Sequence, residues 1–126
     1  MKRITARFFQ TDAGNEPVKV WLQSLARIDC KIVGTDIAKV EFGWPLGMPV
    51  CRPVRGGLRE VRSTIKAGTV EARTYFGIDG SEMILLNGHE GKTGQKHEID
   101  VAIDRWKDYQ ARKRLLAAGQ RKETGK

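Results

Sequence analysis

Arginine, glutamate and tyrosine side chains recur at every second position in two neighbouring stretches of the chain. Glu60 and Arg62 lie two residues apart in one stretch, and Arg73 and Tyr75 lie two apart in the next. Residues two apart in a β-strand point to the same face of the sheet. If a hairpin joins the two strands with these faces together, one surface carries two guanidinium groups, a phenol and a carboxylate. Arginine forks match the geometry of phosphate oxygens, so this pattern predicts a surface that binds or cleaves a phosphodiester.

More polar residues follow in the next part of the chain. The next predicted strand would add Asn87 and His89, and Lys92 follows in a Gly-Lys-Thr-Gly loop. An alternative interpretation is a solvated sheet face on which glutamate and arginine pair across strands, which is common in sheets. The two histidines and two cysteines of the chain do not have the spacing of a zinc site. We therefore expect no metal and no other cofactor.

Seven segments must position these side chains. Alternation with period two, or a short run that is apolar on both faces, predicts four strands, over residues 3–9, 58–65, 70–78 and around 83–86. Helical spacing of apolar residues predicts three helices, over residues 15–25, 29–42 and from about residue 96 onward. The order β-α-α-β-β-β-α indicates an α+β fold. We expect a small, mainly antiparallel four-stranded sheet with the N-terminal helix pair on one face and a C-terminal helix.

The net charge of +8 is concentrated near the C-terminus. Residues 105–126 hold eight Lys and Arg against two acidic residues, and residues 52–73 hold six against two. Both groups are consistent with a polyanionic partner. The length favours one domain over residues 1–110, followed by a basic helix end and tail over 111–126. Because the chain has neither a run of roughly 18 apolar residues nor a secretory h-region, we expect a cytoplasmic protein without a membrane span.

A co-linear set of short motifs extends over about residues 5–109. The set consists of Glu16-Pro17-Val18 with Trp21-Leu22, Phe42-Gly43-Trp44-Pro45-Leu46-Gly47-Met48-Pro49, Gly57-Leu58-Arg59-Glu60-Val61-Arg62, Ala72-Arg73, Ile84-Leu85-Leu86-Asn87-Gly88, and Lys92-Thr93 before the closing helix. In this order the motifs resemble the RelE/ParE superfamily of type II toxins, specifically its HigB-type, phage-derived branch. The set is more specific than any single motif and agrees with the predicted order of elements.

The resemblance implies a RelE-like fold, in which helices flank a small sheet. It also implies an mRNA interferase, an endoribonuclease that cleaves mRNA on the ribosome without a metal. In such cleavage the RNA 2′-hydroxyl attacks its own 3′-phosphate. The implied partner is a co-encoded helix-turn-helix antitoxin similar to HigA, and the chain would contact DNA only through the complex with that antitoxin.

By motif position, the resemblance also implies roles for individual residues. Arg62, Arg73 and Lys92 would bind the phosphate and stabilise the phosphorane charge. Glu60 or His89 would be the general base. The other residues expected to contact RNA are Arg55, Arg59, Tyr75, Lys96 and Tyr109.

The chain departs from the family pattern at three positions. The family usually has an aromatic residue where Arg59 and His89 stand, and a second basic residue where Gly91 stands. These departures leave open a non-toxic relative that only binds an antitoxin. A ParE-like, non-enzymatic poison of DNA gyrase is the other alternative.

Overall fold

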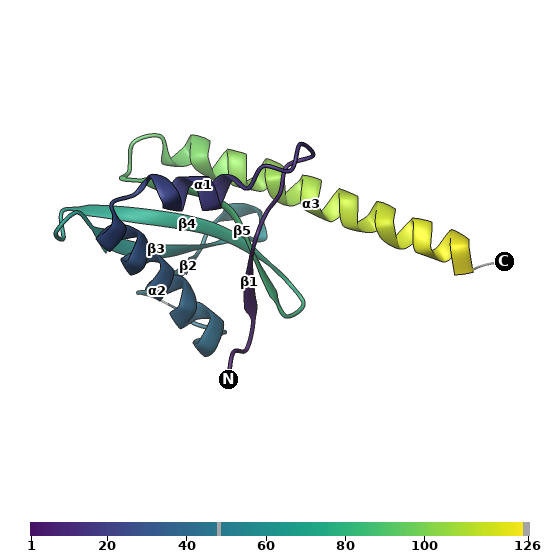
Figure 1. Cartoon of the computed structure of the whole chain (residues 1–126), viewed down its shortest axis with the longest axis horizontal. Coiled ribbons are helices and arrows are strands. Elements are labelled where there is room, and N and C mark those ends of the chain that lie inside the picture. Colours follow the sequence, from purple (N-terminus) through teal and green to yellow (C-terminus); the bar gives the residue numbers. More distant parts are fainter. Residues whose placement is uncertain (48, 125–126) are drawn as a thin grey trace.

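The computed structural model describes residues 1–47 and 49–124; Met48 of the predicted loop and residues 125–126 of the tail lie outside this range. Along the chain the elements are β1 (Thr5–Phe8), α1 (Pro17–Ser24), α2 (Arg27–Gly43), β2 (Cys51–Pro53), a short 3₁₀ helix (Arg55–Gly57), β3 (Arg59–Ile65), β4 (Val70–Asp79), β5 (Glu82–Glu90) and α3 (Gln95–Thr124). Figure 1 shows these elements and the long α3, whose outer end extends away from the sheet. The order confirms the predicted α+β class.

The five strands form one sheet in the order β1-β5-β4-β3-β2. All neighbouring strands are antiparallel except β1 and β5, which run parallel. The predicted number of four strands was therefore wrong by one, because it omitted β2, which pairs with β3. Pro53 lacks an N–H group and is tolerated at the edge of a sheet. Its presence made this short edge strand difficult to tell from a loop.

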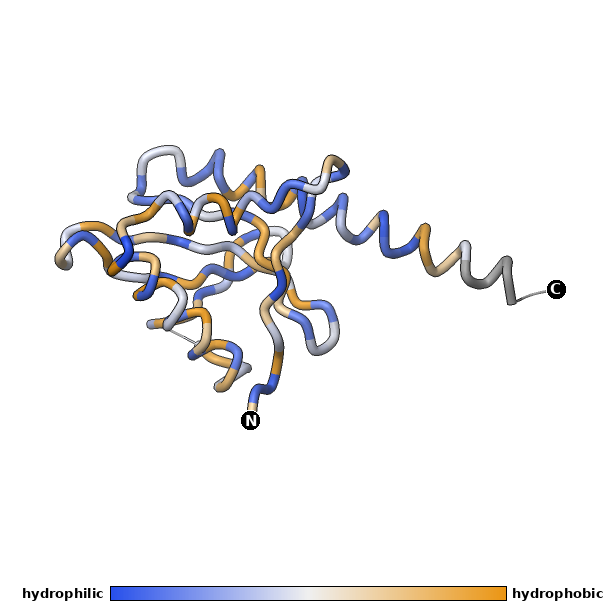
Figure 2. Tube along the Cα trace, viewed as in Figure 1, coloured by the Kyte–Doolittle hydropathy of each residue, from blue (hydrophilic) through white to orange (hydrophobic). Residues whose placement is uncertain are grey.

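Helices cover both faces of the sheet (Figure 1). α1 and α2 pack on one face, over a core that includes Val33 and Phe76, as predicted for the helix pair. α3 packs on the other face, over a smaller core that includes Leu58, Leu86 and Ala102. Figure 2 shows hydrophobic and hydrophilic residues alternating along the elements of the body, which is typical of elements with one buried face.

Two tryptophans lie directly on glycines of the sheet, one on each face. A β-carbon built on Gly88 in β5 would lie 2.2 Å from Cε3 of Trp21 in α1. A β-carbon built on Gly77 in β4 would lie 2.7 Å from Cε3 of Trp106 in α3. Glycine at these two positions therefore allows α1 and α3 to approach the sheet closely. Both rings are partly buried and pack against the core on their side of the sheet.

An irregularity in β5 changes which of its residues face α3. Tyr75 of β4 lies opposite Asn87, but the next residue, Phe76, lies opposite Leu85, so Leu86 is an extra residue in β5. Such a bulge shifts the alternation of the strand by one position. Beyond it, Asn87 and every second residue point to the face on which Tyr75 lies.

The last helix runs on into the basic tail, in agreement with the helix predicted from about residue 96 onward. α3 continues without interruption from Gln95 to Thr124, so helical structure extends past residue 110 into the basic tail. Arg112 donates to the carbonyl of Gln10 at 2.5 Å and to Asp108 at 2.9 Å, and these contacts hold the helix beyond the body. Among the described residues, no helix is both long enough and apolar enough to cross a membrane.

Candidate functional site

The strand register brings the residues predicted to do chemistry into two rows across β3, β4 and β5. The first row is Glu60, Tyr75 and Asn87, and the second is Arg62, Arg73 and His89. This register confirms that the two alternating pairs share one face, and the bulge in β5 brings Asn87 and His89 to the same face. We define these six residues, together with Glu71 and Lys92, as the candidate site.

Two arginines of the candidate site hold one carboxylate between them. Nη2 of Arg62 lies 2.8 and 2.6 Å from Oε1 and Oε2 of Glu71, and Nη2 of Arg73 lies 3.1 Å from Oε2. Arg73 also donates to the carbonyl of Gly91 at 2.7 Å. The hydrogen bonds from Arg62, followed by the charges of Arg62, Arg73 and Lys92, lower the pKa of Glu71. The carboxylate is therefore ionised at neutral pH.

A hollow of about 430 Å³ opens beside these arginines. It is lined by Arg62, Thr69, Val70, Glu71, Arg73, Gly91 and Lys92. Lys92 is exposed, whereas 26% of the Arg62 side chain and 3% of the Arg73 side chain are accessible to solvent. An anion that enters this hollow meets one ammonium group near the surface and two guanidinium groups farther in. We call this space the arginine hollow.

Glu60 lies too deep to act on a bound substrate. Its side chain is fully buried, with Oε2 3.5 Å from Nε of Arg73 and Oε1 3.8 Å from Nε of Arg52. Neither oxygen has a hydrogen-bond partner in the described part of the chain. Burial raises the pKa of Glu60, and the charge of Arg73 opposes this shift. The geometry removes Glu60 from the candidates for the general base and makes it a residue that positions Arg73.

His89 contacts a buried phenol. The Tyr75 hydroxyl lies 2.8 Å from Nε2 of His89, and the two rings stack with their centroids 5.5 Å apart. Burial lowers the pKa of His89, so its imidazole is neutral at pH 7 and can accept a proton. Tyr75 is completely buried, so it offers no surface to an RNA in this structure. Its contacts show that it holds the His89 ring in place.

Both tyrosines of the chain are expected to ionise well above the ordinary value. Burial is the main cause that raises the pKa of Tyr75 and that of Tyr109 to about 12. Between pH 10 and 12 the folded protein keeps these protons and an unfolded chain loses them, so stability falls as pH rises through this range. Ultraviolet difference absorbance should show tyrosine ionisation near pH 12 in the native protein, and near pH 10 after unfolding. Tyrosine ionisation near pH 10 in a protein whose circular dichroism shows that it is still folded would contradict this burial. The variant Tyr109→Phe leaves Tyr75 as the one tyrosine, so its ionisation can be followed alone.

Asn87 ties α3 to the site rather than facing the arginine hollow. Its Nδ2 donates to the Glu98 carbonyl at 3.0 Å and to Glu98 Oε2 at 2.6 Å. Arg105 donates to the carbonyl of Leu86 at 2.8 Å and to Oδ1 of Asn87 at 3.2 Å. These bonds satisfy the polar groups at the bulge. They also hold the start of α3 over the row that contains Tyr75.

Two other residues expected to contact RNA meet at the start of α3. Arg55 forms an ion pair with Asp100 and donates to the carbonyl of Lys96 at 3.4 Å. The side chains of Arg55 and Lys96 are exposed, but neither lines the arginine hollow. The structure therefore places both of them on the surface, outside the candidate site.

Arg59 does not belong to the candidate site, because it points to the opposite face of the sheet. Its guanidinium carbon lies 5.1 Å from the centroid of the Trp44 ring, on the side covered by the helix pair. Adjacent residues of a strand point to opposite faces, so Arg59 and Glu60 cannot share one. Arg59 makes a cation–π contact with a core tryptophan.

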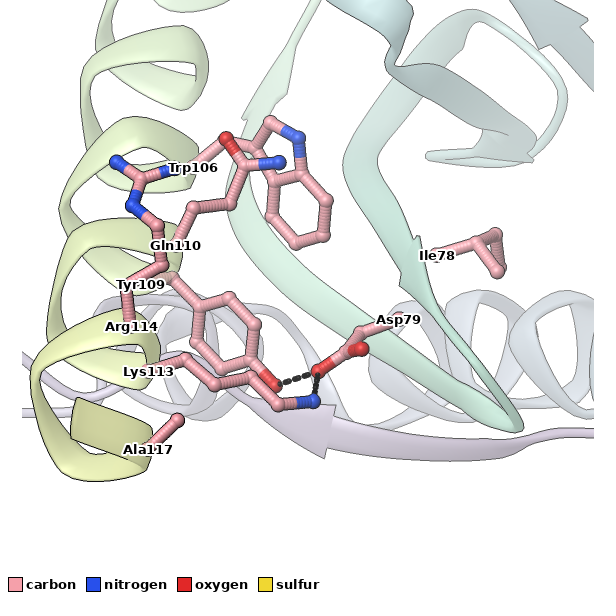
Figure 3. A pocket seen from close by; sticks show the side chains of 8 residues that line it. All are labelled: Ile78, Asp79, Trp106, Tyr109, Gln110, Lys113, Arg114 and Ala117. Carbon is pink, nitrogen blue, oxygen red and sulfur yellow. Dashed lines mark hydrogen bonds and ion pairs between the residues drawn. The ribbon is translucent and has the colours of Figure 1, made fainter. Parts of the chain in front are cut away.

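Tyr109 lies at the far end of β4 from the arginines. It stacks on Trp106 with ring centroids 5.4 Å apart and donates to Asp79 Oδ2 at 2.5 Å. Lys113 pairs with the same carboxylate. These residues line a separate hollow of about 370 Å³ between α3 and β4 (Figure 3). Tyr109 is therefore not part of the candidate site.

Glu71 is the member of the candidate site that the sequence-based prediction omitted. Glu71 lies two residues before Arg73, so strand alternation alone places both on one face. The contact with Arg62 depends on side-chain conformation, which alternation does not specify. Among the described residues, no cluster of three or more His, Cys, Asp and Glu side chains could hold a metal ion.

Comparison with known proteins does not identify a family. No protein-family model matches the chain, and no curated protein matches its sequence. The resemblance to RelE-like toxins rests on the motifs of the chain itself.

Proposed function

We propose that this protein is the toxin of a type II toxin–antitoxin system and that it cleaves mRNA on the ribosome. One observation carries the proposal: two arginines and a lysine surround a single hollow, and a neutral histidine lies beside one of the arginines. Guanidinium and ammonium groups in this arrangement suit a phosphodiester, which carries one negative charge that increases during cleavage. The resemblance to HigB-type toxins supports the same chemistry.

The proposed reaction uses the RNA as its own nucleophile. The 2′-hydroxyl oxygen attacks the adjacent phosphorus, the bond from phosphorus to the 5′-oxygen breaks, and the products are a 2′,3′-cyclic phosphate and a 5′-hydroxyl. Arg62, Arg73 and Lys92 stabilise the additional charge of the phosphorane. His89 takes part in the proton transfer from the 2′-hydroxyl or to the 5′-oxygen. Glu60 holds Arg73 through charge and does not act as the base.

The proposed partners are mRNA on the ribosome and a co-encoded helix-turn-helix antitoxin similar to HigA. Translating ribosomes place the activity in the cytoplasm, and DNA would be contacted only through the antitoxin complex. Inducible expression tests the proposal directly: we expect growth arrest, together with new mRNA ends that map to ribosome-bound positions. Co-expression of the protein encoded next to this gene should restore growth. Arrest with intact mRNA would exclude the endonuclease.

The pH dependence of cleavage should depend on His89. Because burial lowers the pKa of His89, its imidazole becomes protonated only below about pH 6.5, the ordinary histidine value. If neutral His89 accepts the proton, the cleavage rate falls as pH decreases through this lowered pKa. The measurement is the cleavage rate on purified ribosomes against pH. His89→Ala should abolish this acid limb, and His97→Ala, which changes the chain's other histidine, should preserve it. An unchanged profile in His89→Ala would remove His89 from the mechanism.

Burial at the candidate site favours a second candidate function without catalysis. Glu60 and Tyr75 are completely buried and Arg73 is 2% exposed, which is typical of a structural ion-pair network. A non-toxic relative would bind an antitoxin and leave growth unaffected when overexpressed. A ParE-like protein would inhibit DNA supercoiling by gyrase while mRNA stays intact. The expression experiment and a supercoiling assay distinguish these outcomes from mRNA cleavage.

A further inference from the structure

The carboxylate of Glu71 fills the position between the two guanidinium groups of the arginine hollow. It accepts hydrogen bonds from Arg62 at 2.8 and 2.6 Å and from Arg73 at 3.1 Å. A carboxylate and a phosphodiester both present two oxygens to such donors. Glu71 thus makes the contacts that a substrate phosphate would make at the same place.

Glu71 neutralises part of the positive charge around this position. Arg62, Arg73 and Lys92 supply three positive charges, Glu71 pairs with both guanidinium groups, and the buried Glu60 lies between Arg73 and Arg52. Arg73 is shared between both carboxylates, at 3.5 Å from Glu60 and 3.1 Å from Glu71. An anion from solution must therefore displace Glu71 before it can pair fully with Arg62 and Arg73.

The surroundings give the Glu71 side chain space to move. Its side chain is 37% exposed, and it lies between the arginine hollow and a second hollow of about 560 Å³. The second hollow is bordered by Thr64, which lies directly opposite Glu71 in the register. Rotation of the side chain toward this space, which Arg62 and Asp36 also line, would leave the backbone of β4 unchanged and would break its hydrogen bond with Arg73.

We propose that Glu71 is an internal competitor for a phosphoryl oxyanion at Arg62 and Arg73, so that the site is closed by its own carboxylate until a polyanion displaces it. This inference rests on the proposed function for the nature of the ligand. The anion is a phosphoryl group, either a phosphodiester of single-stranded RNA or free phosphate. A ligand with many phosphates displaces Glu71 more readily than a single phosphate does, because neighbouring phosphates add to its attraction.

A structural role for Glu71 makes the opposite prediction. If Glu71 only held Arg62 in a binding conformation, its removal would weaken anion binding. If Glu71 competes with the anion, its removal strengthens binding. Whether the affinity for the anion rises or falls when Glu71 is removed therefore distinguishes the two roles.

The test measures binding of a fluorescent 2′-O-methyl oligoribonucleotide, which cannot be cleaved by 2′-hydroxyl attack. We expect Glu71→Gln to bind it roughly tenfold more tightly than the unchanged protein, since a charge-assisted contact is freed for the ligand. Binding should also become more sensitive to salt, because more phosphates are neutralised. Glu71→Thr removes the same charge, suits a strand, and keeps the test decisive if the amide variant does not fold.

Glu90→Gln is the matched control. It removes one negative charge close to Glu71 in the sheet, but Glu90 pairs with Lys66 at 2.9 Å rather than with the two arginines. We expect this control to change affinity by less than about twofold, as for an exposed ion pair. Equal tightening in Glu71→Gln and Glu90→Gln, or weaker binding in Glu71→Gln, would overturn the proposal.

Two further measurements separate the ligand source and the proposed function. Competition with inorganic phosphate shows whether an isolated anion also binds more tightly to Glu71→Gln. Higher affinity for the oligoribonucleotide alone identifies the phosphodiester as the ligand. Higher affinity for both supports a general oxyanion site. Cleavage of ribosome-bound mRNA by the unchanged protein is measured in parallel. If the unchanged protein cleaves mRNA but Glu71→Gln does not bind the oligoribonucleotide more tightly, the competitor role is refuted and the endonuclease proposal stands. If Glu71→Gln binds more tightly but the unchanged protein does not cleave mRNA, the competitor role stands and the endonuclease proposal is refuted.

Discussion

Replacement of Arg73 by alanine is expected to lower ribosome-dependent mRNA cleavage about 100- to 1,000-fold, the loss typical of removing one donor to a developing oxyanion. Arg73 lies in the middle of the second row of the candidate site, between Arg62 and His89, and contacts Glu60, Glu71 and the carbonyl of Gly91. The contacts with Glu60 and Gly91 fix its guanidinium group before substrate arrives, which is what makes such stabilisation effective. The measurement is the rate at which purified protein cuts mRNA on translating ribosomes, together with growth arrest on induction.

Loss of a buried charge can also unfold a protein, so the experiment needs variants that separate the two effects. Removing one partner of a buried ion pair costs about 3–5 kcal/mol, whereas replacing both by apolar residues of similar volume is often nearly neutral. Arg73→Met combined with Glu60→Leu removes both charges in this way and should keep the thermal transition. Arg27→Ala, at the exposed start of α2, is the control for loss of an arginine. Full cleavage by the folded double variant would show that Arg73 does not belong to the active site.

Strand alternation predicted which residues share a face within each strand, and the shared face across the two strands followed only if a hairpin aligned them. Parity within a strand is local, so the sequence alone placed Glu60 with Arg62, and Arg73 with Tyr75. The turn at residues 66–68 then made the antiparallel pairing of the two strands the simplest arrangement. The observed register, with Arg62 opposite Arg73, confirms it.

The depth of the candidate site could not be predicted in the same way. Tyr75 is buried because α3 packs over it, and that packing depends on contacts such as the one between Asn87 and Glu98, which lie on different elements. The bulge at Leu86 was also invisible, because the run before it is apolar on both faces. As a result, alternation grouped the correct side chains on one face, but Glu60 and Tyr75 were assigned roles that require exposure to solvent.

The bulge at Leu86 and the close contact of Gly88 with Trp21 lie in the same part of β5 and both affect how it is placed. The extra residue at Leu86 directs His89 toward the arginines and leaves Gly88 on the opposite face, against α1. A change at Gly88 therefore acts on the helix pair and on the strand that carries His89 together.

Gly88→Ala is expected to destabilise the protein by about 3 kcal/mol, the upper range for forcing an extra methyl group into a filled core. The new β-carbon would lie 2.2 Å from Cε3 and 2.3 Å from Cζ3 of Trp21, and a rigid indole ring cannot yield without moving α1. For a domain of this size, such a loss lowers the melting temperature by roughly 10 °C. Thermal unfolding followed by circular dichroism measures the change directly.

Two comparisons determine whether the collision with Trp21 is the cause. Gly34→Ala adds the same methyl group on α2, where no atom lies within 4 Å, and should stabilise the helix by about 0.5–1 kcal/mol. In the second comparison, Trp21→Leu alone loses stability because a large ring leaves the core. Combined with Gly88→Ala, however, Trp21→Leu should cost less than the sum of the two single changes, since the smaller side chain leaves room for the methyl group. Additive losses would mean that Gly88 is required for its backbone conformation instead, and that the position of α1 on β5 does not depend on this contact.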